Sequence, residues 1–199
     1  MKKPNHSGSG QIRIIGGQWR GRKLPVPDSP GLRPTTDRVR ETLFNWLAPV
    51  IVDAQCLDCF AGSGALGLEF ASRGGTSVLI ERDPQNARNL SDVCAKLKAG
   101  DDAVVRRGDS LTLTRSYPER SFDVVFIDPP FAAGLHQSAL SAAARVLTDD
   151  GLIYLESPSE HEMPVPEDFA VLRSGSSGAV RYQLLARKAP PLADLAKED

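Results

Sequence analysis

The sequence predicts an α/β fold with a mostly parallel, twisted sheet, an antiparallel hairpin at its carboxyl-terminal edge and a β-hairpin extension at the amino terminus. From residue 55 onward, short apolar runs alternate with segments of helical period. A glycine-rich turn over Gly62–Gly67 joins the first run to the first helical segment, and two β-rich runs close the pattern. This alternation is typical of right-handed βαβ units.

The first elements form an extension ahead of this pattern. Residues 1–10 are polar and are predicted to be a disordered tail. Residues 11–34 are predicted to form a β-hairpin followed by a proline-rich connector. The hairpin strands are expected at Gln11–Ile15 and Gln18–Val26, with a turn at Gly16–Gly17.

The alternating body is expected to span residues 35–187, and residues 188–199 are predicted to be a second disordered tail. Helical spacing and capping residues place helices at 37–47, 65–73, 84–99 and 135–147. Apolar runs place strands at 56–60, 77–81, 103–107, 122–127, 152–156, 169–173 and 180–186. Thr36 or Asp37 can cap the first helix, and Asp83 can cap the third.

Charge is distributed unevenly along the chain, although the net charge is only −1. Residues 1–40 hold nine Lys or Arg and two Asp or Glu. Residues 41–199 hold fifteen Lys or Arg and twenty-three Asp or Glu. A basic arm on an acidic body indicates a polyanionic partner. A solvated basic tail is the alternative, but Ile12, Ile14 and Trp19 give the arm apolar residues to pack.

Composition argues against several classes of protein. No apolar run approaches the roughly 20 residues that span a bilayer, and Met1–Gly10 lacks the apolar core of a signal peptide. We therefore expect a cytoplasmic protein with no membrane partner. Cys56 and Cys59 form one C-x-x-C pair, for which buried packing is a better interpretation than redox or zinc chemistry. The histidines are scattered, so no metal site is expected.

A ligand site is predicted at the carboxyl ends of the first strands, where such sheets bind ligands. Gly62 and Gly64 let the backbone approach a ligand closely. Glu81 can accept hydrogen bonds from ribose hydroxyls, but nicotinamide-binding proteins use a carboxylate in the same way, so Glu81 does not distinguish between cofactors. Asp58 favours a cationic, amine-bearing ligand over a pyrophosphate. Gly108–Ser110 can bind an adenine amino group or form a plain polar turn. The candidate cofactor-binding residues are Asp58, Phe60, Gly62, Ser63, Gly64, Glu81, Arg82, Asp109 and Ser110.

The segment after the fourth strand carries the candidate catalytic residues, which are Asp128, Pro129, Pro130 and Phe131. An exocyclic amine of a nucleic-acid base is a weak nucleophile because its lone pair is delocalised into the ring. The Asp128 carboxylate and the Pro129 carbonyl can accept its two N–H groups, and Phe131 can stack on the base. Such a base must be flipped out or unpaired to enter the site. A rigid turn with a buried phenylalanine is the alternative interpretation.

These motifs resemble those of known enzymes. Asp58–Gly67, Glu81 and Asp128–Phe131 look like motifs of class I S-adenosylmethionine-dependent methyltransferases that act on amino nitrogens. Arg13–Leu24 and Leu32–Phe44 resemble, more specifically, the bacterial small-subunit ribosomal RNA guanine-N2 methyltransferases of the RsmD type.

This resemblance extends over roughly residues 11–187 and implies a Rossmann-like class I methyltransferase fold. It also implies S-adenosyl-L-methionine as cofactor and the N2 amine of a guanine in 16S ribosomal RNA as substrate, within an assembling small ribosomal subunit. We expect a monomer. By the same resemblance, the residues expected to contact RNA are Arg13, Arg20, Arg22, Lys23, Arg33, Thr35 and Arg38.

Other functions remain open at this level. A DNA adenine-N6 methyltransferase uses the same acidic, proline-stiffened motif, but no separate target-recognition domain is evident. A glutamine-N5 protein methyltransferase would carry Asn where Asp128 stands. A nicotinamide-dependent oxidoreductase would explain the glycines and Glu81 but neither Asp128–Phe131 nor the basic arm. A non-catalytic RNA-binding protein would have no need of an intact acidic motif.

Overall fold

The computed structural model describes residues 11–25, 37–160 and 163–188. The tail predicted at 1–10, most of the connector between 26 and 34, and the tail predicted at 188–199 apart from Lys188 lie outside these ranges. Within them, no helix is longer than 14 residues or apolar enough to cross a membrane.

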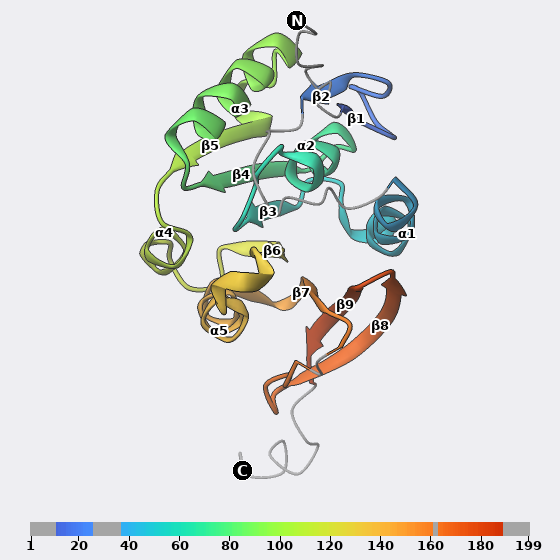
Figure 1. The fold of residues 1–199 in the computed structure, drawn as a ribbon, viewed down its shortest axis with the longest axis vertical. Coiled ribbons are helices and arrows are strands. Elements are labelled where there is room, and N and C mark those ends of the chain that lie inside the picture. The colour runs from blue at the N-terminus through green and yellow to red at the C-terminus, as the bar shows by residue number, and fades with distance from the viewer. Residues whose placement is uncertain (1–10, 26–36, 161–162, 189–199) are drawn as a thin grey trace, which may run out of the picture.

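A seven-stranded sheet forms the centre of the molecule, with the strand order β5-β4-β3-β6-β7-β9-β8 (Figure 1). The strands are β3 (Gln55–Asp58), β4 (Thr76–Glu81), β5 (Ala103–Arg107), β6 (Phe122–Ile127), β7 (Leu147–Pro158), β8 (Phe169–Ser177) and β9 (Val180–Arg187). The first five run parallel to one another, whereas β9 pairs antiparallel with both β7 and β8. The predicted parallel sheet with an antiparallel carboxyl-terminal edge is confirmed.

Five α-helices connect the strands or precede them in the described ranges. They are α1 (Asp37–Leu47), α2 (Ala65–Ser72), α3 (Pro84–Leu97), α4 (Ser110–Ser116) and α5 (His136–Val146). The sequence pattern missed α4, because Ser and Thr have modest helix propensity and Leu111 and Leu113 are two residues apart, as in a strand. The helix forms because Asp109 caps it and both leucines pack against the core.

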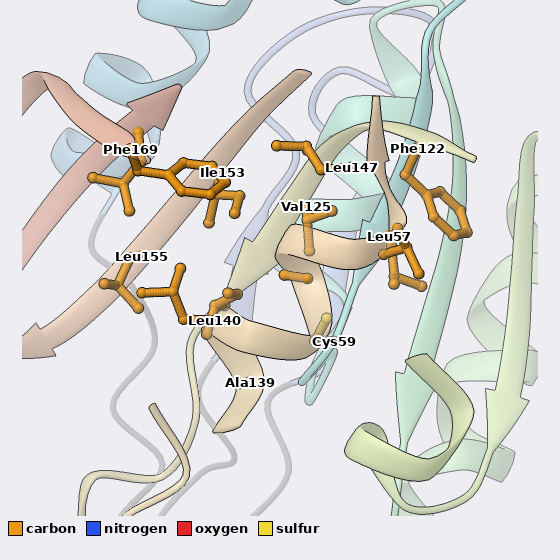
Figure 2. Packing of buried hydrophobic residues seen from close by; sticks show 14 of the residues in the cluster. Leu57, Cys59, Phe122, Val125, Ala139, Leu140, Leu147, Ile153, Leu155 and Phe169 are labelled. Atoms are coloured by element: carbon orange, nitrogen blue, oxygen red, sulfur yellow. The ribbon is translucent and has the colours of Figure 1, made fainter. Parts of the chain in front are cut away.

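The central strands of the sheet are covered on both faces, which explains why a strand such as β6 is almost continuously apolar, whereas most residues of the edge strand β8 are exposed or half-buried. Along β6, Val125 and Ile127 point to the face covered by α5, where they join Leu140 in one core cluster (Figure 2). Val124 and Phe126 point to the opposite face, where side chains of α1 and α2 pack on them. Cys56 and Cys59 are buried in different clusters on opposite faces, so they pack separately, as predicted.

The amino-terminal hairpin differs from its predicted form. Its strands are only β1 (Gln11–Arg13) and β2 (Lys23–Pro25), joined by nine residues rather than by a turn at Gly16–Gly17. The prediction was wrong because the chain reverses after the two glycines, where the Arg20 N–H donates to the Gly17 carbonyl at 3.2 Å and the Arg22 N–H to the Trp19 carbonyl at 3.0 Å. Other N–H groups of the connection donate to side chains of α2, as described below.

Other boundaries moved by a few residues. Strand β7 starts at Leu147 rather than at 152, since it also pairs with the start of β6. Helix α3 ends at Leu97, and Lys98 takes the left-handed conformation at its end, with φ of 55°. The first predicted strand of the body ends at Asp58 rather than at 60, because the chain there turns into the glycine-rich loop.

Candidate active site

Two acidic residues meet at the carboxyl edge of the sheet. Asp58 is the last residue of β3, and Asp128 follows the last residue of β6. These strands are parallel neighbours in which Asp58 is paired with Phe126, so their two loops leave the sheet side by side. The negative charge of Asp58 contributes to raising the pKa of Asp128, after burial and the charge of Glu156. The structure therefore brings the two predicted loops into one site.

The glycine turn holds the chain close to its neighbours. Gly62 and Gly64 have φ of 52° and 79°, which side-chain-bearing residues rarely adopt. A Cβ on Gly67 would lie 2.8 Å from the Leu79 side chain and 3.1 Å from the Asp58 carboxylate. Because glycine has no Cβ, the backbone comes close enough for the Gly67 N–H to donate to Asp58 Oδ2 at 3.0 Å. The glycines thus let α2 start directly above the Asp58 carboxylate.

Asp58 is buried, with an exposed fraction of 3%. Burial raises the pKa of this carboxyl group to about 7, and the charge of Glu81 adds to the effect, while N–H donors at Gly67 and Phe60 oppose it. A carboxyl group in this state binds a proton in the free protein near neutral pH. A cationic ligand placed beside it would favour the ionised form.

Glu81 connects three segments of the site. Its Oε2 accepts the Gly62 N–H at 2.9 Å, and its Oε1 accepts the Asp83 N–H at 2.7 Å. Burial raises the pKa of this half-buried carboxyl group, and the two N–H donors oppose that rise. Each carboxylate oxygen has further lone-pair capacity, which suits a ligand carrying two adjacent hydroxyl groups.

Asp109 is the N-cap residue of α4. Its carboxylate accepts the N–H and the hydroxyl of Thr112, both at 3.0 Å. These bonds, and next the charge of Arg82, lower the pKa of Asp109. Asp109 and Arg82 are exposed near the ends of β5 and β4, whereas Ser110 is buried in the first turn of α4. The predicted polar turn is therefore the start of a helix.

The proline-stiffened loop places Phe131 at the surface and Pro129 in the interior. Pro130 is exposed and precedes a short 3₁₀ helix, Phe131–Ala133. Phe131 is 39% exposed, and its ring centroid lies 5.9 Å from that of His136. An exposed aromatic ring directly beyond Asp128 can stack on a flat ligand.

The sequence pattern missed three side chains near Asp128, which are His136, Tyr154 and Glu156. Tyr154 and Glu156 are buried near the end of β7, and the Tyr154 hydroxyl donates to Glu156 Oε1 at 2.7 Å. The imidazole of His136 is hydrogen-bonded to the backbone of Glu156, while burial lowers its pKa. The available clue was a tyrosine and a glutamate two residues apart, hence on one face, in an otherwise apolar strand.

A small hollow of about 60 Å³ lies between the glycine turn and the amino-terminal hairpin. Its lining residues are Pro25, Gly62, Ser63, Asn86, Asn89, Leu90 and Val93. Pro25 of the hairpin therefore lies beside the predicted ligand loop. In the described parts of the chain, no three acidic, cysteine or histidine side chains are arranged to hold a metal ion.

The hairpin presents one basic face and one apolar face. Ile12, Ile14, Trp19 and Leu24 are buried in the same cluster as residues of α2 and α3. The exposed side chains alternate with them and include the predicted RNA contacts Arg13, Arg20, Arg22 and Lys23. Arg38 is exposed on α1, while the predicted contacts Arg33 and Thr35 lie outside the described residues. A solvated tail is therefore excluded for residues 11–25.

One buried glutamate of α2 anchors the hairpin to the body. Glu69 accepts the N–H groups of Ile15 and Gly16, each at 2.7 Å, and pairs with Arg73 at 2.8 Å. Arg40 is fully buried and lies 3.8 Å from the same carboxylate. Although Arg40 belongs to the basic first forty residues, its charge lies in the interior and is not part of the surface.

Ser72 completes this anchor. Its hydroxyl donates to the Gly16 carbonyl at 2.6 Å and accepts the Trp19 N–H at 2.9 Å. Gly17 has φ of 74°, and a Cβ there would lie 1.7 Å from the Ser72 carbonyl oxygen. The glycines at positions 16 and 17 thus serve a close approach to α2 rather than a two-residue turn.

Comparison with known proteins agrees with this geometry. The model of a family described as Conserved hypothetical protein 95 matches residues 12–186. A ribosomal RNA small subunit methyltransferase D of Escherichia coli is 57% identical over 193 residues, covering 95% of this chain and 96% of its own length. The protein of the same name from Haemophilus influenzae is 43% identical over 192 residues, and the match covers 92% of this chain and 98% of that protein.

A solved structure from E. coli with a methyltransferase name superposes with a TM-score of 0.82 at 51% identity, covering 91% of this chain and all of its own. The expected Rossmann-like methyltransferase fold is confirmed by this likeness. Because the family model and the named relatives cover nearly the whole chain at high identity, the protein belongs to the family of ribosomal RNA small subunit methyltransferase D.

Proposed function

We propose that this protein transfers a methyl group from S-adenosyl-L-methionine to the exocyclic N2 amine of a guanine in 16S ribosomal RNA. One observation carries the proposal: the loops after β3 and β6 leave the sheet side by side, so that Asp58 and Asp128 belong to one site. Names of the relatives support ribosomal RNA of the small subunit as the class of substrate.

The residues of the glycine turn fit this cofactor. Asp58 is a buried carboxyl group whose pKa is raised to about 7, so a cationic amino group beside it would become its counter-ion. Glu81 has the lone pairs to hold a ribose diol, and we propose that the segment around Asp109 binds the adenine ring. Further contacts in our proposal come from Phe60, Ser63 and Arg82. When bound, S-adenosylmethionine supplies an electrophilic methyl group on a sulfonium centre.

The Asp128 loop fits the amine. The Asp128 carboxylate and the Pro129 carbonyl accept the two N–H groups and orient the nitrogen lone pair, while Phe131 stacks on the guanine. Acceptors that are already in place stabilise the positive charge that develops on nitrogen without reorganisation. Pro129 and Pro130 fix two φ angles, so the loop is preorganised for this task.

The basic face of the hairpin fits the RNA backbone. Arg13, Arg20, Arg22 and Lys23 are exposed on a platform fixed to α2. Phosphate contacts of this kind position a nucleic acid and do not read its sequence. We propose that the hairpin holds the RNA while an unpaired or flipped guanine enters the site, in the context of an assembling small subunit. We propose that the protein acts as a monomer.

The alternatives fit less well. A pyrophosphate beside Asp58 would either be repelled by its ionised form or keep it protonated, whereas a cationic ligand would be its counter-ion, which argues against an oxidoreductase. A DNA adenine-N6 methyltransferase remains chemically close, since the same two acceptors can bind an adenine amine. No specific feature of the described residues favours DNA over RNA.

The test is methyl transfer with labelled S-adenosylmethionine to assembled small subunits, naked 16S RNA and duplex DNA. We expect label in the ribosomal substrates, and N2-methylguanine after digestion and mass spectrometry. Asp128→Ala serves as the negative control. Label only in DNA, or as N6-methyladenine, would overturn the proposal.

A further inference from the structure

The carboxyl end of β7 forms the wall beside Asp128. In the parallel pairing of β6 and β7, Ile127 lies opposite Leu155, so Asp128 and Glu156 are the next residues along in register. Side chains in register on adjacent parallel strands point to the same face. Glu156 is only 4% exposed, and its charge acts directly on Asp128. Two carboxyl groups therefore lie next to each other, with Glu156 buried and Asp128 half-buried.

Glu156 is held in this position by its surroundings. The Tyr154 hydroxyl donates to Glu156 Oε1 at 2.7 Å from the same face of β7. On the far side, β9 places Tyr182 opposite Glu156, and the Tyr182 ring lies 5.7 Å from that of Trp46 on α1. The Glu156 carboxylate thus has little freedom to turn away from Asp128.

A second contact links Glu156 to the loop that carries Phe131. His136, at the start of α5, is hydrogen-bonded to the backbone of Glu156, and its ring packs against Phe131. The end of β7 therefore contacts both parts of the proposed amine site, the acceptor and the aromatic ring.

The titratable groups around Asp128 come from four elements. They are Asp58 on β3, Tyr154 and Glu156 on β7, His136 on α5 and Tyr182 on β9, with Glu81 acting on Asp58. Burial raises the pKa of Asp128 well above its usual range, and the largest charge effect comes from Glu156. The charge of Asp58 acts in the same direction and would be offset by a bound cationic ligand.

We propose that Glu156, held by Tyr154, is a positioning residue that acts through Asp128 and makes it the acceptor of the proton lost by the amine on methylation. This inference rests on the proposed function. As the N–C bond forms, the C–S bond of the donor breaks and its electron pair stays on sulfur. One N–H bond then breaks, its electrons return to nitrogen, and the proton passes to the Asp128 carboxylate.

The neighbouring charge matters because a general base works best when its pKa lies near the working pH. An ordinary surface aspartate is a weak proton acceptor at neutral pH, whereas an aspartate beside a second, buried carboxylate is a stronger one. Glu156 thereby serves the proton transfer without touching the substrate.

The test compares the pH dependence of kcat for the wild type, Glu156→Gln and Glu119→Gln, with saturating cofactor and RNA. Asp128 must be ionised to accept a proton, so kcat falls as the pH drops through its pKa. Removing the adjacent charge lowers that pKa. Glu156→Gln should therefore shift this fall of kcat, the acid limb of the pH profile, to lower pH by about one unit. The plateau kcat should fall roughly tenfold, with the KM for RNA unchanged.

Glu119→Gln is the matched control, since Glu119 is exposed and pairs with Arg145 at the surface. Its profile should match the wild type. Tyr154→Phe removes one hydroxyl and covers the case in which Glu156→Gln does not fold, and it should shift the limb in the same direction by a smaller amount. Glu156→Asp keeps the charge and should keep the wild-type limb.

Two results would overturn the inference. A loss of kcat at every pH with an unmoved acid limb, in both Glu156→Gln and Tyr154→Phe, would show a merely structural role. An unchanged kcat and profile in both variants would show no role at all. Failure of the proposed function itself is distinguishable, because the wild type would then form no N2-methylguanine.

Discussion

Glu69 and Glu156 are both buried glutamates, but their neighbours have opposite character. Glu69 is surrounded by positive charge and by donors, namely Arg40, Arg73 and the N–H groups of Ile15 and Gly16. Glu156 accepts from a tyrosine and lies beside the carboxyl group of Asp128. The first arrangement compensates a buried charge, whereas the second places like charges together.

This difference separates an anchor from a reactive site. A buried charge with matched partners stabilises one geometry, and loss of one partner is costly because the other stays buried. Like charges placed together destabilise the fold and shift pKa values, which is typical of functional sites. In this protein, the anchor fixes the basic hairpin on α2, and the cluster of carboxyl groups supports the proposed amine site.

The largest expected effect concerns the reactive side of the comparison. Asp128→Asn keeps the shape of the side chain but weakens its ability to accept an N–H or a proton. We expect kcat to fall roughly 10³-fold, because one preorganised polar group contributes that much at its upper range. Single-turnover assays would measure this loss.

Calorimetric titration should show that Asp128→Asn still binds S-adenosylmethionine within a few-fold of the wild type. Asp149→Asn, an exposed residue paired with Arg120, is the matched control and should leave kcat unchanged. Retained activity of Asp128→Asn would remove Asp128 from the mechanism.

The next effect concerns the anchor. Glu69→Gln removes the buried carboxylate that faces Arg40 and Arg73, although Arg40 keeps its ion pair with Asp37 at 2.6 Å. We expect the free energy of unfolding to fall by about 3 kcal/mol, the low end for a broken buried ion pair. Urea titration monitored by circular dichroism would measure it. In the same assay, Glu156→Gln should cost less stability than Glu69→Gln, since it also removes a like charge beside Asp128. Equal losses in both variants would erase the distinction drawn between the two glutamates.

The third effect, of similar or smaller size, is a pH dependence of the free energy of unfolding that is caused by Asp58. Its pKa is about 7 in the folded state and near 3.8 in the unfolded state, so the folded protein binds the proton more tightly. Stability of the free protein should therefore fall as the pH rises from about 4 to 7, on the order of 3 kcal/mol in total. Asp58→Asn lacks this titration.

We therefore expect Asp58→Asn to unfold at a higher temperature than the wild type at pH 8 and at nearly the same temperature at pH 4. Differential scanning calorimetry at both values would check this. The variant should also lose affinity for S-adenosylmethionine. If the two proteins show the same pH dependence of Tm, Asp58 does not carry the buried proton.

The smallest effect concerns the surface that the anchor supports. Replacing Arg20, Arg22 and Lys23 together with Ala removes three exposed charges from the hairpin. We expect RNA affinity to fall roughly tenfold and the slope of log K against log salt to flatten by about 2. Filter binding over a salt series would measure both.

Replacing Arg115, Arg120 and Arg173 with Ala removes the same number of charges elsewhere and is the matched control. An unchanged slope in the hairpin variant would move the RNA footprint away from the hairpin. Combining the hairpin variant with Glu69→Gln should add little to the loss of affinity, because both act through the same platform.

Local patterns were sufficient to predict most elements of the sheet and its helices. β5 and β6 have the predicted bounds, and α3 starts where Asp83 and Pro84 indicate. The elements that were missed or misplaced depend on distant partners. Helix α4 needs the core beneath it, and the hairpin connection needs α2, fifty residues or more away in the chain.

The sequence by itself determined the α/β fold, the glycine turn after β3 and the acidic loop after β6, because periodicity and turn chemistry are local properties. Only the tertiary structure decided that Arg40 is an internal charge, that Glu69 anchors the hairpin and that Glu156 stands beside Asp128. The burial and partners of an ionisable side chain follow from which strands and helices become neighbours. That information is not contained in the residues on either side of it.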